Sequence, residues 1–82
     1  MYKNKAENGN NNLCGPKVKA LREKLSPKTS QKKLADMLQL AGLDVDKNAV
    51  QRIESGQRFV TDIELRTLAK VLHASYEELL ND

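Results

Sequence analysis

Residues 46–58 read DKNAVQRIESGQR, and this stretch decides the fold. On a helix that turns about 100° per residue, its apolar side chains share one face and its long polar side chains share the opposite face. The apolar face, which suits packing on a core, carries Ala49, Val50 and Ile53. The polar face carries side chains whose donors and acceptors match base edges in the DNA major groove: Lys47, Asn48, Gln51 and Arg52. A solvated surface would explain the same residues, so the rest of the chain must decide.

Two further helices are expected before this one. Pro16 suits a first turn, Pro27 ends the helix, and the apolar residues between them have helical spacing: Val18, Leu21 and Leu25. Ser30 is the expected N-cap of the second helix, whose inner face is predicted to hold Leu34, Ala35, Leu38 and Ala41. Gly42 can close that helix in the left-handed conformation, and Asp46 is the expected N-cap of the third helix, which begins at Lys47.

Two helices are expected after Gly56, the glycine that should end the third helix. Capping boxes of the form S/T-x-x-E mark their starts at Thr61 and Ser75. The first continues with apolar residues at i, i+3, i+4 and i+7, namely Leu65, Leu68, Ala69 and Leu72. No segment alternates with a period of two. The sequence therefore predicts an all-α fold with five helices.

Length and composition suit one small intracellular domain. The chain has 82 residues, a single cysteine and no apolar run near the roughly 20 residues that span a bilayer. We expect a soluble cytoplasmic protein with no membrane partner. Residues 1–14 are polar and Asn-rich and are expected to form a disordered arm, whose alternative role is to follow a nucleic-acid groove through Lys3 and Lys5. Residues 15–82 form the expected domain.

Basic residues gather in the first part of that domain. From Gly15 to Arg58 there are ten Lys or Arg against five Asp or Glu, a balance of +5, whereas residues 59–82 hold two against five, a balance of −3. Such asymmetry indicates that one face meets a polyanion. The three aromatic residues argue against base stacking on single strands, which favours double-stranded DNA.

Enzymatic chemistry finds little support. His73 is the only histidine and is expected at a helix end, and Cys14 lies in the expected arm without a partner. Asp44 and Asp46 lack the further acidic ligands of a calcium loop, and no phosphate-binding glycine loop occurs. We expect no catalytic residue, no metal site and no cofactor.

The arrangement of two helices joined by a short turn, the second with a donor-rich face, is typical of a helix-turn-helix. The whole pattern resembles the phage-repressor helix-turn-helix family, the lambda-repressor-like and Cro-type regulators, over about residues 16–80. The segments that carry the resemblance are VKALREKL, SQKKLADML, DKNAVQRIESGQR and LRTLAKVLHASYEELL. The matching positions are Gln31, Leu34, Ala35, Ile53, Glu54, Gly56, Leu65, Leu68, Ala69 and Leu72.

The resemblance implies roles for particular residues. It implies base reading by Lys47, Asn48 and Arg52, with Gln51 as a fourth candidate. It implies DNA backbone contacts at the start of the second helix and in the loop after the third; with the basic and hydroxyl residues there, the predicted phosphate contacts are Ser30, Gln31, Lys32, Ser55, Gln57 and Arg58. Gln31 would also brace the recognition helix, and Arg22 and Glu54 would form a buried structural ion pair.

Two positions depart from the family pattern. The spacing from Gln31 to Glu54 is about five residues longer than usual, so the second helix or the turn must be extended and the docking angle on DNA stays open. His73 stands where family members commonly have glycine, which predicts a strained helix end.

These features predict a sequence-specific, double-stranded-DNA-binding transcriptional regulator that acts as a repressor. The family usually binds as a dimer on pseudo-palindromic sites, and Tyr76, Leu79 and Leu80 are candidate interface residues. The alternative is a helical protein-interaction module, such as an antitoxin or a regulatory subunit, that does not read DNA itself. The chain ends soon after the fifth expected helix, so we expect neither a sensor domain nor a small-molecule ligand. The operator, the regulated genes and the inducing signal do not follow from the sequence.

Overall fold

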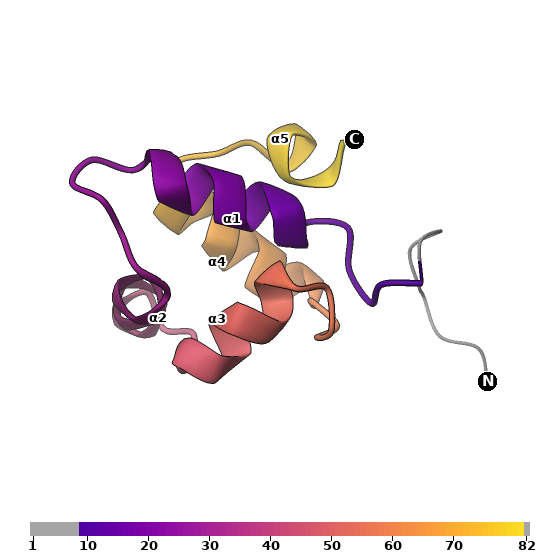
Figure 1. Ribbon diagram of the computed structural model, residues 1–82, viewed down its shortest axis with the longest axis horizontal. Coiled ribbons are helices and arrows are strands. Elements are labelled where there is room, and N and C mark those ends of the chain that lie inside the picture. Colours follow the sequence, from indigo (N-terminus) through magenta and orange to yellow (C-terminus); the bar gives the residue numbers. More distant parts are fainter. Residues whose placement is uncertain (1–8, 82) are drawn as a thin grey trace.

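The computed structural model describes residues 9–81, and the chain forms five helices there (Figure 1). Their bounds are α1 Gly15–Lys24, α2 Gln31–Leu40, α3 Lys47–Glu54, α4 Asp62–Leu72 and α5 Tyr76–Leu80. No strand occurs between residues 9 and 81, so the predicted all-α fold is confirmed. Within the same range, no helix has the length and apolar character needed to cross a membrane.

The helices from α2 onward begin at the capping residues that the sequence predicts. The Ser30 hydroxyl accepts a hydrogen bond from the Lys33 amide at 3.0 Å, and the Asp46 carboxylate accepts one from the Ala49 amide at 2.8 Å. Both predicted capping boxes are present, Thr61 with Glu64 and Ser75 with Glu78. These bonds satisfy first-turn amides that have no partner within the helix. Local chemistry therefore sets where these helices start.

The core lies between α1 and the other helices. In Figure 1, α1 crosses the middle of the molecule with α4 behind it, α5 on one side and α3 on the other. Helix α2, seen almost end-on, packs against α3 and α4. The largest fully buried side chains are Leu34, Leu38, Ile53, Leu68, Leu79, Val18, Val50 and Cys14. Ala41 was predicted on the inner face of α2 but is exposed, because α2 ends at Leu40 and Ala41 is its C-cap.

The extra length between Gln31 and Glu54 is accommodated in the turn that joins α2 to α3. Residues 41–46 separate the two helices, whereas three or four residues are typical of this motif. The longer turn is anchored at both ends. Leu43 donates its amide to the Leu38 carbonyl at 2.9 Å, and the Gln39 side-chain amide donates to the Val45 carbonyl at 2.7 Å. The apolar side chain of Val45 is buried, so the turn packs as part of the core.

Residues 9–14 differ from the disordered arm expected over residues 1–14. The Cys14 side chain is only 1% exposed, and Asn11 and Asn12 hydrogen-bond to backbone groups of residues 53–58. Polar composition suggested disorder, but each asparagine amide finds backbone partners that are distant in sequence. The packed part of the chain therefore begins before residue 15, while residues 1–8, including Lys3 and Lys5, lie outside the described residues.

Helix ends follow the predicted glycine pattern with one exception. Gly42 after α2 has φ +95° and Gly56 after α3 has φ +82°, both in the left-handed region where glycine is favoured. His73 ends α4 with φ +55° and is the only described residue other than glycine with positive φ. Its Cβ makes this conformation costly, which agrees with the strain expected at this position.

Replacing His73 with glycine should stabilise the protein. Glycine removes the Cβ clash at φ +55° but raises the entropy of the unfolded chain, so we expect a net gain of about 0.5–1 kcal/mol. Urea denaturation followed by circular dichroism measures it. Lys70→Gly, within the same helix, should instead cost about 1 kcal/mol. A lower urea midpoint for His73→Gly would show that the imidazole stabilises this helix end.

Candidate nucleic-acid interface

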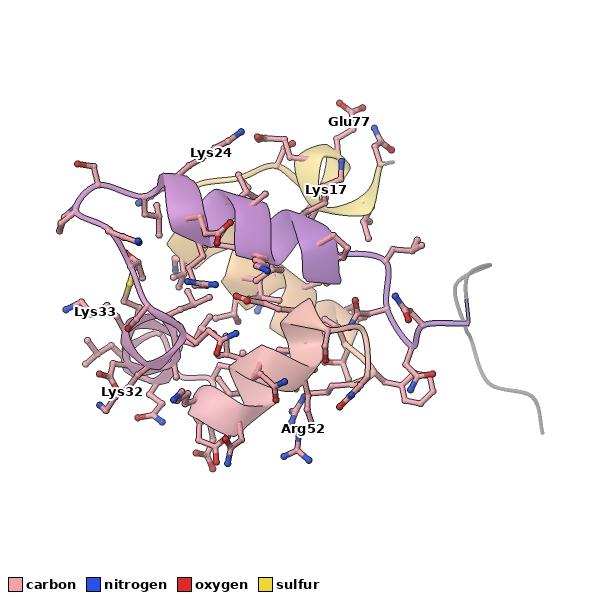
Figure 2. All side chains as sticks on the ribbon, in the orientation of Figure 1. Lys17, Lys24, Lys32, Lys33, Arg52 and Glu77 are labelled. Carbon is pink, nitrogen blue, oxygen red and sulfur yellow. The ribbon has the colours of Figure 1, made fainter. Side chains whose placement is uncertain are left out.

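Helix α3 presents the polar arc to the outside. Its apolar residues Ala49, Val50 and Ile53 are buried against α1 and α2. The four predicted base-reading side chains are all exposed: Lys47, Asn48, Gln51 and Arg52. Figure 2 shows Arg52 extending away from the helical body. The two faces deduced from helical spacing are thus the buried and exposed faces of α3, and the exposed one can approach a ligand as large as a duplex.

A buried ion pair holds α3 against α1. The Arg22 guanidinium donates from Nε to Glu54 Oε2 at 2.7 Å and from Nη2 to Glu54 Oε1 at 3.1 Å. Their side chains are 10% and 3% exposed. Arg22 Nη1 also donates to the Thr29 carbonyl at 2.9 Å, which ties in the segment before α2. The hydrogen bond to Glu54, more than any other interaction, raises the pKa of Arg22, so the guanidinium stays charged.

Gln31 joins this network from the first turn of α2. Its side-chain amide donates to Glu54 Oε1 at 3.0 Å. Glu54 therefore accepts bonds from two elements besides its own helix, and α1, α2 and α3 meet at one carboxylate. This is the bracing contact implied for Gln31, whose side chain is half-buried.

A cationic hollow of about 680 Å³ opens beside this network at the start of α2. It is lined by Arg22, Lys28, Thr29, Ser30, Gln31, Lys32 and Lys47. Lys47 is also the first residue of α3, so the hollow adjoins the exposed α3 face. The free amides at a helix N-terminus and three exposed lysines attract anions there. Since its lining includes no acidic residue, the hollow suits a phosphate group.

Lys28 was not among the predicted phosphate contacts, although it lines this hollow. It lies outside both helices and carries no motif signal of its own. Its position becomes informative only because Arg22 binds the adjacent Thr29 carbonyl and holds the segment beside α2. The excess of basic residues from 15 to 58 is the one feature of the sequence that could have suggested it.

The loop after α3 holds the remaining predicted phosphate contacts. Ser55 and Gln57 are exposed, and the Ser55 hydroxyl donates to the Arg52 carbonyl at 3.3 Å. Arg58 is half-buried, and its Nη2 donates to Glu64 Oε2 at 2.8 Å. The guanidinium of Arg58 is thus partly engaged by α4, while Ser55 and Gln57 are open to a ligand.

The residues considered for catalysis or metal binding are not placed to perform either. Burial raises the pKa of the Cys14 thiol to about 11, so near neutral pH it is not the thiolate that a nucleophile requires. His73 is exposed at the end of α4, and Asp46 is occupied in capping α3. No group of three or more His, Cys, Asp or Glu that could hold a metal ion occurs in the described part of the chain.

Comparison with known proteins gives one match. The model of a helix-turn-helix family matches residues 18–79, which include all five helices except the ends of the first and last. No curated protein and no solved structure matches the chain.

Proposed function

This chain belongs to the phage-repressor-like helix-turn-helix family, whose members are DNA-binding transcription regulators, and from that premise we propose that it is a sequence-specific repressor that occupies double-stranded DNA. The observation that carries the proposal is the joint exposure of the α3 polar face and the cationic hollow that adjoins it through Lys47. A helix of this size fits the major groove, and a neighbouring phosphate site fixes its register on the duplex.

Base reading is assigned to the exposed face of α3. Arg52 and Lys47 have donors that match guanine O6 and N7, and Asn48 and Gln51 have amides that match adenine N6 and N7. Backbone contacts are assigned to the hollow, through Ser30, Gln31, Lys32 and Lys28, and to the loop, through Ser55, Gln57 and the exposed part of the Arg58 side chain. Because these contacts come from both sides of α3, they would hold the helix along the groove.

We place a homodimer interface on the exposed apolar side chains of α4 and α5. Ile63 is 65% exposed and Tyr76 is 50% exposed, and both line a shallow hollow with Asp62, Leu65 and Arg66. Leu80 is exposed nearby in sequence, whereas Leu79 is fully buried and so cannot contact a partner, contrary to its candidacy from the sequence. Two copies would present their recognition helices about 34 Å apart, one turn of DNA.

Selection of bound sequences from random duplexes tests the function directly. We expect an enriched pseudo-palindrome with half-sites about one helical turn apart. Arg52→Ala should lose about 1–3 kcal/mol at one base position and relax the preference there. Lys24→Ala is the control, because Lys24 lies across the molecule from Arg52 (Figure 2) and should leave binding unchanged. Selection that enriches no sequence would favour a protein-interaction module instead.

A further inference from the structure

Residues 10–12 precede the part of the chain that the family model matches, yet they bind the loop that follows the recognition helix. Asn11 donates its backbone amide to the Gly56 carbonyl at 2.8 Å and its side-chain amide to the Gln57 carbonyl at 2.8 Å. Asn12 donates from Nδ2 to the Arg58 carbonyl at 2.7 Å. Three successive carbonyls of the loop are therefore held by two adjacent asparagines, which we call the asparagine clamp.

Asn12 uses both ends of its side-chain amide. Its Nδ2 also donates to the Ile53 carbonyl in the last turn of α3 at 3.1 Å, and its Oδ1 accepts from the Gly15 amide at 2.8 Å. One side chain thus links the start of α1, the end of α3 and the loop. Only an amide offers two donors and an acceptor in this arrangement. Aspartate keeps the acceptor but loses both donors, which makes it an informative substitution.

Two glycines permit this close approach. A Cβ on Gly15 would collide with the Ile53 carbonyl oxygen and lie 3.0 Å from Asn12 Oδ1. A Cβ on Gly56 would lie 2.6 Å from the side chain of Asn10. Figure 1 shows the N-terminal segment running beside the loop that leaves α3. The segment is therefore seated against the loop through contacts that larger residues at these positions would block.

The loop's own hydrogen bonds leave its outer part dependent on the clamp. The amides of Gln57 and Arg58 both donate to the Arg52 carbonyl, at 2.9 and 3.1 Å, so they fix the loop to the helix on one side. The carbonyls of residues 56–58 are held on the other side by the clamp. Gln57, an exposed loop residue assigned to the DNA backbone, lies between these two sets of bonds, whereas Ser55 is held by the bond from its amide to the Gln51 carbonyl at 3.0 Å.

We propose that Asn12, assisted by Asn11, is a positioning residue for DNA binding: it holds the loop after α3 in the conformation that contacts phosphate, without touching DNA itself. The inference rests on the proposed function and extends the DNA-binding unit to residues before the matched range. It predicts that the clamp affects affinity for all duplexes alike and leaves the preferred base sequence unchanged, because base reading stays with α3.

The test compares Asn12→Asp and Asn12→Ala with Asn81→Asp and Asn81→Ala, matched controls at an exposed asparagine near the C-terminus. Duplex affinity is measured at a temperature where circular dichroism shows every variant folded. Both Asn12 variants should bind about ten-fold more weakly than their controls, since a hydrogen bond to a charged phosphate has about that value. Asn11→Ala keeps the backbone bond to Gly56 and should show a smaller loss of duplex affinity. This variant tests the inference if the Asn12 variants fold poorly.

A double-variant cycle separates positioning from general destabilisation. If Asn12 acts through the loop, Asn12→Ala should weaken binding less in a background that carries Ser55→Ala and Gln57→Ala than it does in the parent. Parent-like affinity of the folded Asn12 and Asn11 variants, or full additivity with the loop substitutions, would overturn the inference while leaving the proposed function intact. A parent protein that binds no duplex would overturn both.

Discussion

Glu54→Ala should remove much of the protein's stability, lowering the free energy of unfolding by about 3–5 kcal/mol. The substitution removes a carboxylate that is 3% exposed and leaves the Arg22 guanidinium, 10% exposed, without its bidentate partner. It also removes the acceptor of Gln31 in α2. A buried charge without a partner keeps its desolvation cost, which is why breaking such a pair is more harmful than replacing it. Since about 1 kcal/mol shifts the melting temperature of a domain this size by about 4–8 °C, the midpoint should fall by more than about 10 °C.

An exposed pair in the same protein provides the control. Lys32 and Asp36 lie 3.3 Å apart in α2, with side chains 74% and 50% exposed. Water screens such a pair and alanine favours a helix more than aspartate does, so Asp36→Ala should change the free energy of unfolding by no more than about 0.5 kcal/mol. Calorimetric melting of both variants against the parent measures the contrast. Equal, small shifts for the two would mean that water reaches Arg22 once Glu54 is removed.

Affinity for duplex DNA should fall steeply as salt rises. Lys28 and Lys32 in the hollow and Arg58 in the loop are the cationic side chains assigned to phosphate, and each neutralised phosphate releases counterions. With three such contacts, the binding constant should drop about forty-fold between about 50 and 200 mM salt, and about two-thousand-fold for a dimer with twice as many. Fluorescence anisotropy of a labelled duplex over a salt series gives the slope directly.

Removing one positive charge at a time shows which surface of the protein causes the salt dependence. Lys28→Gln should reduce the magnitude of the slope by about 0.9 per protomer, because one counterion-releasing contact is lost. Lys24→Gln removes the same charge at a residue that does not line the hollow and that Figure 2 shows across the molecule from Arg52, so it should leave the slope unchanged. Equal slopes for all three proteins would exclude the hollow from the DNA contact.

Helix boundaries and the exposed α3 face were predictable because their causes are local. Ser30, Asp46, Thr61 and Ser75 cap the helices that follow them through bonds spanning three residues, which a sequence displays directly. The faces of α3 follow from helical periodicity, which assigns Arg52 and Ile53 to opposite sides without knowledge of any partner. The left-handed ends at Gly42 and His73 are equally local.

The asparagine clamp and the full lining of the hollow were not predictable in this way. Asn12 binds carbonyls 41 and 46 residues further along the chain, and composition alone made its surroundings look disordered. Lys28 lines the hollow because Arg22 of α1 holds the Thr29 carbonyl beside α2. The partial engagement of Arg58 depends likewise on Glu64 of α4. None of these contacts has a periodic or motif signature.

Sequence by itself thus determined the number and type of helices, their caps and the side of α3 that faces outward, because bonds within a few residues and a 3.6-residue repeat dictate them. Only the tertiary structure decided that residues before α1 hold the loop after α3, and that Lys28 shares a hollow with Lys47. Hydrogen bonds and charge clusters between distant segments depend on how the helices pack. The spacing of residues within one segment does not indicate which distant segments it will contact.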